Sequence, residues 1–162
     1  LLEGVMPSYI KNLEEGIIER LLRLGNKVPD AVEMGFHLCY GDSQHKHFCE
    51  PEDTNKLVHI SNALAQGLSR TLNWIHMPVP KDRSDEDYYK PLANLVMNEG
   101  TELYLGLIHN TDGESGANSR IESALKYVSS FGVATECGFG RRPQNTLAGL
   151  MDIHAAVADP HD

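Results

Sequence analysis

The stretch Val32-Glu33-Met34-Gly35-Phe36-His37-Leu38-Cys39-Tyr40 decides both the expected fold and the candidate site. It has the composition of a buried strand, and side chains two positions apart on a strand share one face. His37 and Cys39 are therefore expected on the same face, with the apolar side chains on the other. Imidazole and thiolate are good zinc ligands, but this pair needs a further ligand from elsewhere in the chain. The best candidate is Cys137.

The composition limits the possible function classes. With 162 residues and 41% hydrophobic residues, we expect one globular domain over 1–162. The net charge of −9, without a lysine or arginine cluster, disfavours nucleic acid and anionic membrane surfaces as partners. No apolar run approaches the ~20 residues of a membrane helix. Three cysteines, an odd number, favour a reducing compartment, so we expect the cytoplasm.

Hydrophobic periodicity predicts strands alternating with helices after an N-terminal helix at 8–24. A Ser84/Asp87 capping box should open the second of the later helices, and a polar loop at 110–118 should precede the third. The expected strands cover 32–40, 72–79, 102–109 and 133–137. The later helices are expected at 53–69, 84–96, 121–128 and 143–157.

Four such βα units predict an α/β fold with a parallel sheet, and near-continuous apolar strands suggest that both faces are covered. Unusual polar residues occur where these strands end, which is the active-site edge of (βα)8 barrels and open α/β sheets. A barrel needs eight strands, so we interpret the chain as half of a TIM-type (βα)8 barrel. The other half is then absent from the protein, supplied by a second copy, or carried by a segment outside this sequence.

The cysteines have an alternative interpretation. Free cysteine is one of the most buried residue types, so Cys39 and Cys137 could be small core residues, with His37 a hydrogen-bonded core histidine. Their position at strand ends, where loops converge, favours the metal site.

Three segments carry a resemblance to a known family. Phe36-His37-Leu38-Cys39-Tyr40-Gly41-Asp42 resembles the His-x-Cys-Tyr strand end of cobalamin-independent methionine synthases. Glu136-Cys137-Gly138-Phe139-Gly140-Arg141-Arg142 resembles their later Cys-Gly strand end, and Leu107-Ile108-His109-Asn110 is similar to the strand between them. The resemblance implies the C-terminal half of a barrel of the methionine synthase and uroporphyrinogen decarboxylase superfamily.

The resemblance also implies a zinc ion held by His37, Cys39 and Cys137. In that family, zinc binds a substrate thiol as a thiolate, which then attacks a methyl donor. Coordination deprotonates a thiol whose free pKa is about 8.5, and three protein ligands leave one position open for it. The expected function is a zinc-dependent thiol alkyl- or methyltransferase acting on a small-molecule thiol and an alkyl donor.

The second strand departs from the family pattern. The synthases have a glutamate ligand there, whereas this chain has Asn73-Trp74-Ile75-His76-Met77. His76 could be the fourth ligand, or the site could have only three protein ligands. By the same resemblance His109 would donate a proton to the leaving group, with Asp112 orienting it. His109 could instead cap its strand end through a hydrogen bond to the loop.

Arg141 and Arg142 precede the last helix and could bind a substrate carboxylate or phosphate. They could equally pair with carboxylates of the protein. Two further functions stay open: a metal-free, decarboxylase-like relative acting on a carboxylate-rich substrate, and an inactive half-barrel that serves as a binding or assembly module. Because a half-barrel exposes its edge strands and interior face, we expect a homo-oligomer or association with the missing N-terminal half of the barrel.

Overall fold

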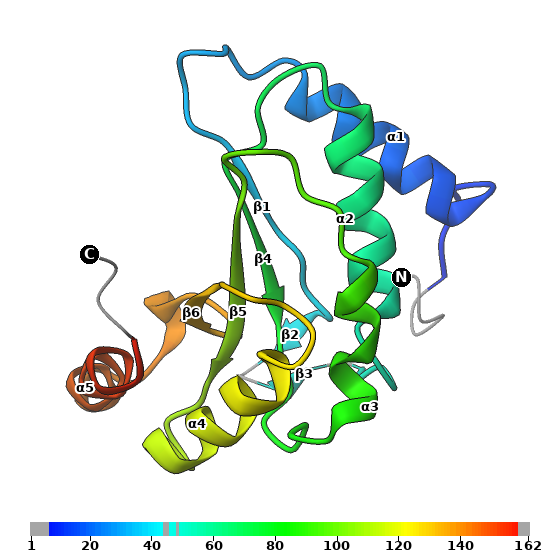
Figure 1. The fold of residues 1–162 in the computed structure, drawn as a ribbon. Helices are drawn as coiled ribbons and strands as arrows, with labels where there is room; N and C mark the ends of the chain where they lie inside the picture. Colours follow the sequence, from blue (N-terminus) through cyan, green and yellow to red (C-terminus); the bar gives the residue numbers. More distant parts are fainter. Residues whose placement is uncertain (1–6, 44–45, 48, 159–162) are drawn as a thin grey trace.

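A computed structural model describes residues 7–43, 46–47 and 49–158, and within them one sheet of four parallel strands organises the chain (Figure 1). The strands are hydrogen-bonded in the order β1-β4-β5-β6. A separate antiparallel pair, β2 (Asp42–Ser43) and β3 (Lys46–His47), follows β1. The strands of the main sheet are β1 (Gly35–His37), β4 (Trp74–Pro78), β5 (Glu102–Ile108) and β6 (Gly132–Thr135).

Each new strand of the main sheet is added beside the preceding one, always in the same direction. A doubly wound sheet reverses direction at a switch point, whereas a barrel does not. Helices flank the sheet, and Figure 1 shows α1 and α2 running side by side. The chain therefore has the expected α/β fold, with the winding of half a TIM-type barrel.

The helices of the described residues are short. None of them is long and apolar enough to cross a lipid bilayer. They comprise the α-helices α1 (Leu13–Gly25), α2 (Asn55–Gly67), α3 (Glu86–Tyr89), α4 (Gly113–Ala124) and α5 (Leu147–Val157), and the 3-10 helices η1 (Lys90–Asn94), η2 (Phe139–Arg141) and η3 (Gln144–Thr146).

Two local predictions were wrong. Asp85, rather than Ser84, caps α3, because its carboxylate accepts the Tyr88 backbone N–H at 3.1 Å. Helix α4 begins at Gly113, within the segment expected to be a loop. Its buried residues are alanines, a serine and Arg120, so the helix lacks the large apolar stripe that periodicity detects.

The two faces of the sheet differ in packing. Ile75, Met77 and Leu105 are buried in the hydrophobic core. Trp74 and Tyr104 alternate with them, and they line an open cavity on the opposite face. The expectation that both faces are covered therefore holds only in part, since the face that becomes the interior of a closed barrel is open beside Trp74 and Tyr104 but buried at His76 and Ile108.

Candidate metal centre

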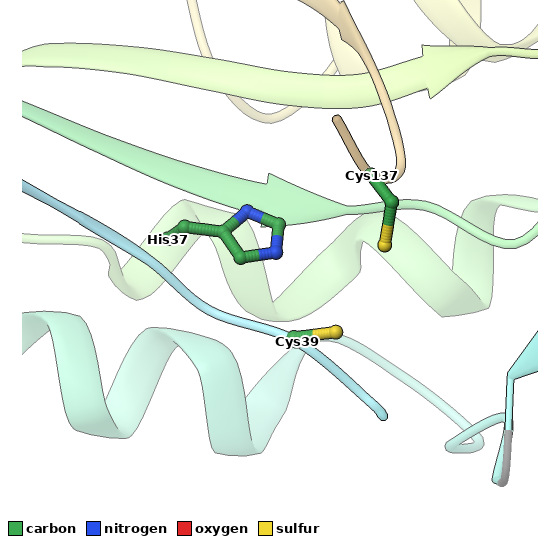
Figure 2. Close-up of side chains that lie close together, drawn as sticks. All are labelled: His37, Cys39 and Cys137. Carbon is green, nitrogen blue, oxygen red and sulfur yellow. The ribbon is translucent and has the colours of Figure 1, made fainter. Parts of the chain in front are cut away.

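Three of the expected ligands come together at the carboxyl-terminal end of the sheet. His37 is the last residue of β1, and Cys39 lies two residues beyond it. Cys137 lies two residues beyond the end of β6. One ligand atom from each residue lies within 4.8 Å of the other two. Figure 2 shows the sulfur atoms and the outer edge of the His37 ring pointing into one shared space.

The donor set fits a zinc ion. Zinc bonds of about 2.3 Å to sulfur and about 2.0 Å to nitrogen, at tetrahedral angles, separate ligand atoms by about 3.5–3.8 Å. The observed limit of 4.8 Å is therefore about 1 Å wider than such a site. The Cys39 side chain is exposed and is therefore free to rotate toward the other two ligands. Two thiolates would balance the charge of a divalent cation.

The environment of each sulfur also suits this role. The Gly41 backbone N–H donates to Cys39 Sγ at 3.3 Å, which helps to fix the position of this sulfur. Cys137 is buried, so few competing water molecules reach it. Burial lowers the pKa of His37, which favours the neutral ring that a metal requires.

His76 is not part of this three-residue group. Its Nδ1 lies 2.7 Å from Nδ1 of His37, and the rings stack with centroids 4.7 Å apart. Its Nε2 lies 3.1 Å from the Thr135 carbonyl oxygen. Burial, with a smaller effect from His37, lowers the pKa of His76 to about 4. Because both ring nitrogens are engaged within the protein, the geometry does not support His76 as a fourth ligand.

A cavity of about 610 Å³ adjoins the group on the open face of the sheet. Its lining includes His37, Cys137 and His76, together with Trp74, Tyr104, Phe139 and His154. No lysine, arginine, aspartate or glutamate is among the described residues that line it. The volume is in the range of small-molecule sites, and the lining suits an apolar or aromatic group.

His109 lies in a buried polar network away from that lining. Its Nε2–H donates to the Val79 carbonyl at 2.9 Å, and its Nδ1 lies 3.4 Å from Oε2 of Glu136. Burial lowers the pKa of His109, and the Glu136 carboxylate opposes part of that shift. Among the described residues, Oε2 of Glu136 is buried and accepts no hydrogen bond. A proton on Nδ1 would complete this contact.

The Asp112 carboxylate lies near His109 but is paired with an arginine. Both of its carboxylate oxygens accept from the buried Arg120 guanidinium, at 2.7 and 3.0 Å. Arg120 also donates to the carbonyls of Leu107 and Lys81. Asp112 is therefore committed to Arg120, and the carboxylate nearest to the His109 ring is that of Glu136.

Of the two arginines expected to bind a substrate anion after the last strand, the structure describes the side chain of Arg142. Arg142 donates from Nη2 to Oε1 of Glu136 at 2.8 Å, and both side chains are 10% exposed. It therefore pairs with a carboxylate of the protein, which was the alternative to binding a substrate anion. The side chain of Arg141 lies outside the part of the chain that the structure describes.

Sequence reasoning missed the role of Glu136 and that of Arg120. Glu136 directly precedes Cys137, and the cysteine alone gives this segment its interest as a metal-binding motif. The partner of Glu136, His109, is 27 positions away in the sequence. Arg120 was hidden in a segment that had no apolar stripe. A charged residue at a strand end or on a glycine-rich helix can be recognised in the sequence as unusual. The sequence does not show which residue it pairs with.

Comparison with known proteins gives one structural relative. No protein-family model and no curated protein matches the chain. The crystal structure of a Listeria monocytogenes protein, provisionally named a vitamin-B12 independent methionine synthase, is similar at a TM-score of 0.57 and 16% identity. The match covers 96% of this chain and 45% of that protein, so the chain spans less than half of its length. At this identity the likeness establishes a shared fold.

Proposed function

We propose that this chain carries the metal-binding part of a zinc-dependent thiol alkyl- or methyltransferase. The observation that supports this most strongly is the group of His37, Cys39 and Cys137, with ligand atoms within 4.8 Å at the active-site edge of the sheet. The fold shared with a protein provisionally named a methionine synthase adds support.

Zinc bound at this position would take a substrate thiol as its fourth ligand and keep it deprotonated, so that sulfur is nucleophilic at neutral pH. Cys39 and Cys137 would supply two thiolates and His37 a neutral nitrogen. Phe139, which follows β6 at the same edge of the sheet and lines the adjoining cavity, would contact the organic part of a ligand. The two substrates are a small-molecule thiol and an alkyl donor.

His109 is the proton donor to the leaving group that the resemblance implies, but the geometry adds no support for this role, because both ring nitrogens face partners within the protein and the ring lies away from the cavity lining. With Nε2–H bonded to Val79, an added proton resides on Nδ1, where Glu136 accepts it. Arg142 holds Glu136 from the other side. Glu136 thus takes the orienting role that the sequence suggested for Asp112.

A carboxylate-rich substrate gains no support from this geometry. The described cavity lining contains no lysine or arginine, and the Arg142 guanidinium is paired with Glu136. A metal-free, decarboxylase-like activity would require cations that face the ligand. We therefore do not propose it as a second function.

The metal content of purified chains tests the proposal. We expect one zinc per chain, measured by plasma emission spectroscopy after reconstitution, and loss of that zinc in Cys39→Ser and in Cys137→Ser. Cys49→Ser is the matched control, since Cys49 is a free cysteine outside the group and its loss should leave the zinc content unchanged. Native protein with intact thiols that takes up no zinc would rule out this mechanism.

A further inference from the structure

A chain of side-chain contacts links the two strands that carry the candidate ligands. It starts at His37 on β1, passes through His76 on β4 and ends at the Thr135 carbonyl on β6. The two contacts measure 2.7 and 3.1 Å, and His76 is 8% exposed. The connection therefore crosses the interior face of the sheet, over the intervening strand β5.

Gly106 on β5 leaves the space for this crossing. A Cβ atom at this position would lie 2.8 Å from His76 Nε2 and 2.8 Å from the Thr135 carbonyl oxygen. Any side chain larger than hydrogen would occupy the path of the hydrogen bond. The crossing thus depends on one particular glycine as well as on His76.

The direction of the hydrogen bonds follows from the last acceptor. A carbonyl oxygen can only accept, so Nε2 of His76 must carry the proton of that contact. In a neutral His76 ring, Nδ1 then has a lone pair and accepts, which requires the proton of His37 to lie on its own Nδ1. The lone pair of His37 is left on Nε2, at the ring edge that Figure 2 shows turned toward the two sulfurs.

We propose that His76 is a positioning residue that holds His37 in the tautomer whose Nε2 can bind metal. This inference rests on the metal-binding part of the proposed function. An isolated neutral histidine distributes its proton over both nitrogens, so without an acceptor at Nδ1 part of the His37 population would present an N–H to the metal. His76 also fixes the plane of the ring, through the hydrogen bond and the stacking contact.

Two variants of His76 separate these contacts. In His76→Asn the amide oxygen lies close to the former Nδ1 and can still accept from His37, whereas the bond to Thr135 is lost. In His76→Gln the amide lies close to the former Nε2 and can still bond Thr135, whereas the acceptor for His37 is lost. Both variants replace an aromatic ring by an amide, so they are matched in polarity.

The tautomer is read from two-bond ¹H–¹⁵N correlation spectra of metal-free protein at about pH 7.5, above the ordinary histidine pKa of about 6.5. We expect His37 with its proton on Nδ1 in the native chain and in His76→Asn, and a mixture of tautomers in His76→Gln. Zinc affinity, measured by competition with a chromophoric chelator, should fall about 10–100-fold in His76→Gln and far less in His76→Asn.

The outcomes distinguish this inference from the proposed function. A native chain with the His37 proton on Nε2, or a His76→Gln variant with an unchanged tautomer, would overturn the role of His76 whether or not zinc binds. The expected tautomers in a chain that binds no zinc would instead defeat the proposed function and leave the control of His37 by His76 in place.

Discussion

Replacing Gly106 by alanine adds one methyl group at the centre of the sheet. The new Cβ would meet His76 Nε2 at 2.8 Å, the Thr135 carbonyl oxygen at 2.8 Å and the Glu136 Cα at 2.9 Å. Two of these atoms belong to the backbone, and the buried His76 ring has little room to move. The strands must therefore separate locally, or the hydrogen bond between His76 and Thr135 must break.

Both responses are costly. Inserting a methyl group into a packed interior costs about 1–3 kcal/mol. A buried donor or acceptor that loses its partner costs about 1–3 kcal/mol more. We therefore expect Gly106→Ala to lower the free energy of unfolding by about 1–3 kcal/mol if one response occurs and by about 2–6 kcal/mol if both occur. Water that enters from the adjoining cavity would lower the cost of the broken hydrogen bond.

Urea unfolding of metal-free protein, followed by circular dichroism, measures this change. Gly140→Ala is the matched control, because a Cβ at Gly140 would meet no atom within 4 Å and its backbone φ is not positive. We expect the control to stay within about 0.5 kcal/mol of the native chain. A Gly106→Ala protein as stable as that control would refute the close packing of the His76–Thr135 hydrogen bond over Gly106.

Two further predictions concern pH and association. Burial lowers the pKa of His37, His76 and His109, so the unfolded chain binds more protons than the folded chain below about pH 6.5, and metal-free protein should lose stability as pH falls from there to about 4. For His76, with a folded pKa of about 4, the loss amounts to about 3 kcal/mol, and urea midpoints that stay level from about pH 7 to about 5 would contradict it. The edge strands and the open face beside Trp74 also predict that the chain forms a homo-oligomer or binds the other half of a barrel, whereas sedimentation as a monomer at high dilution would count against this.

Strand order and the location of the site were accessible from the sequence for a simple reason. Parallel strands place all their carboxyl ends at one edge, so polar residues at those ends are brought together whatever the connecting loops do. His37, Cys39 and Cys137 meet this condition, and the structure gathers their ligand atoms. The prediction needed only which residues end the strands.

The partners of the buried histidines could not be obtained in the same way. His76 lies in the middle of β4, and the direction of its ring depends on the space above Gly106, a feature of a different strand. Asp112 is close to His109 in sequence, yet both of its carboxylate oxygens accept hydrogen bonds from Arg120, which lies further along α4. Glu136 approaches His109 from the neighbouring strand. Such pairings depend on cross-strand register and on side-chain torsions, and hydrophobic periodicity reports neither.

The position of the candidate ligands bears on the curvature of the sheet. His37 and Cys39 belong to β1 and its continuation, and Cys137 follows β6, so they come from the two opposite edges of the sheet. In a flat sheet, three strand spacings of about 4.8 Å would hold these edges about 14 Å apart. Ligand atoms within 4.8 Å of one another are compatible with a sheet that bends toward this face, together with the reach of the His37 ring and the position of both cysteines beyond the strand ends. The half-barrel form therefore contributes to the proposed zinc site by turning both edges toward one interior, while the His37 ring and the residues beyond the strand ends span the remaining distance.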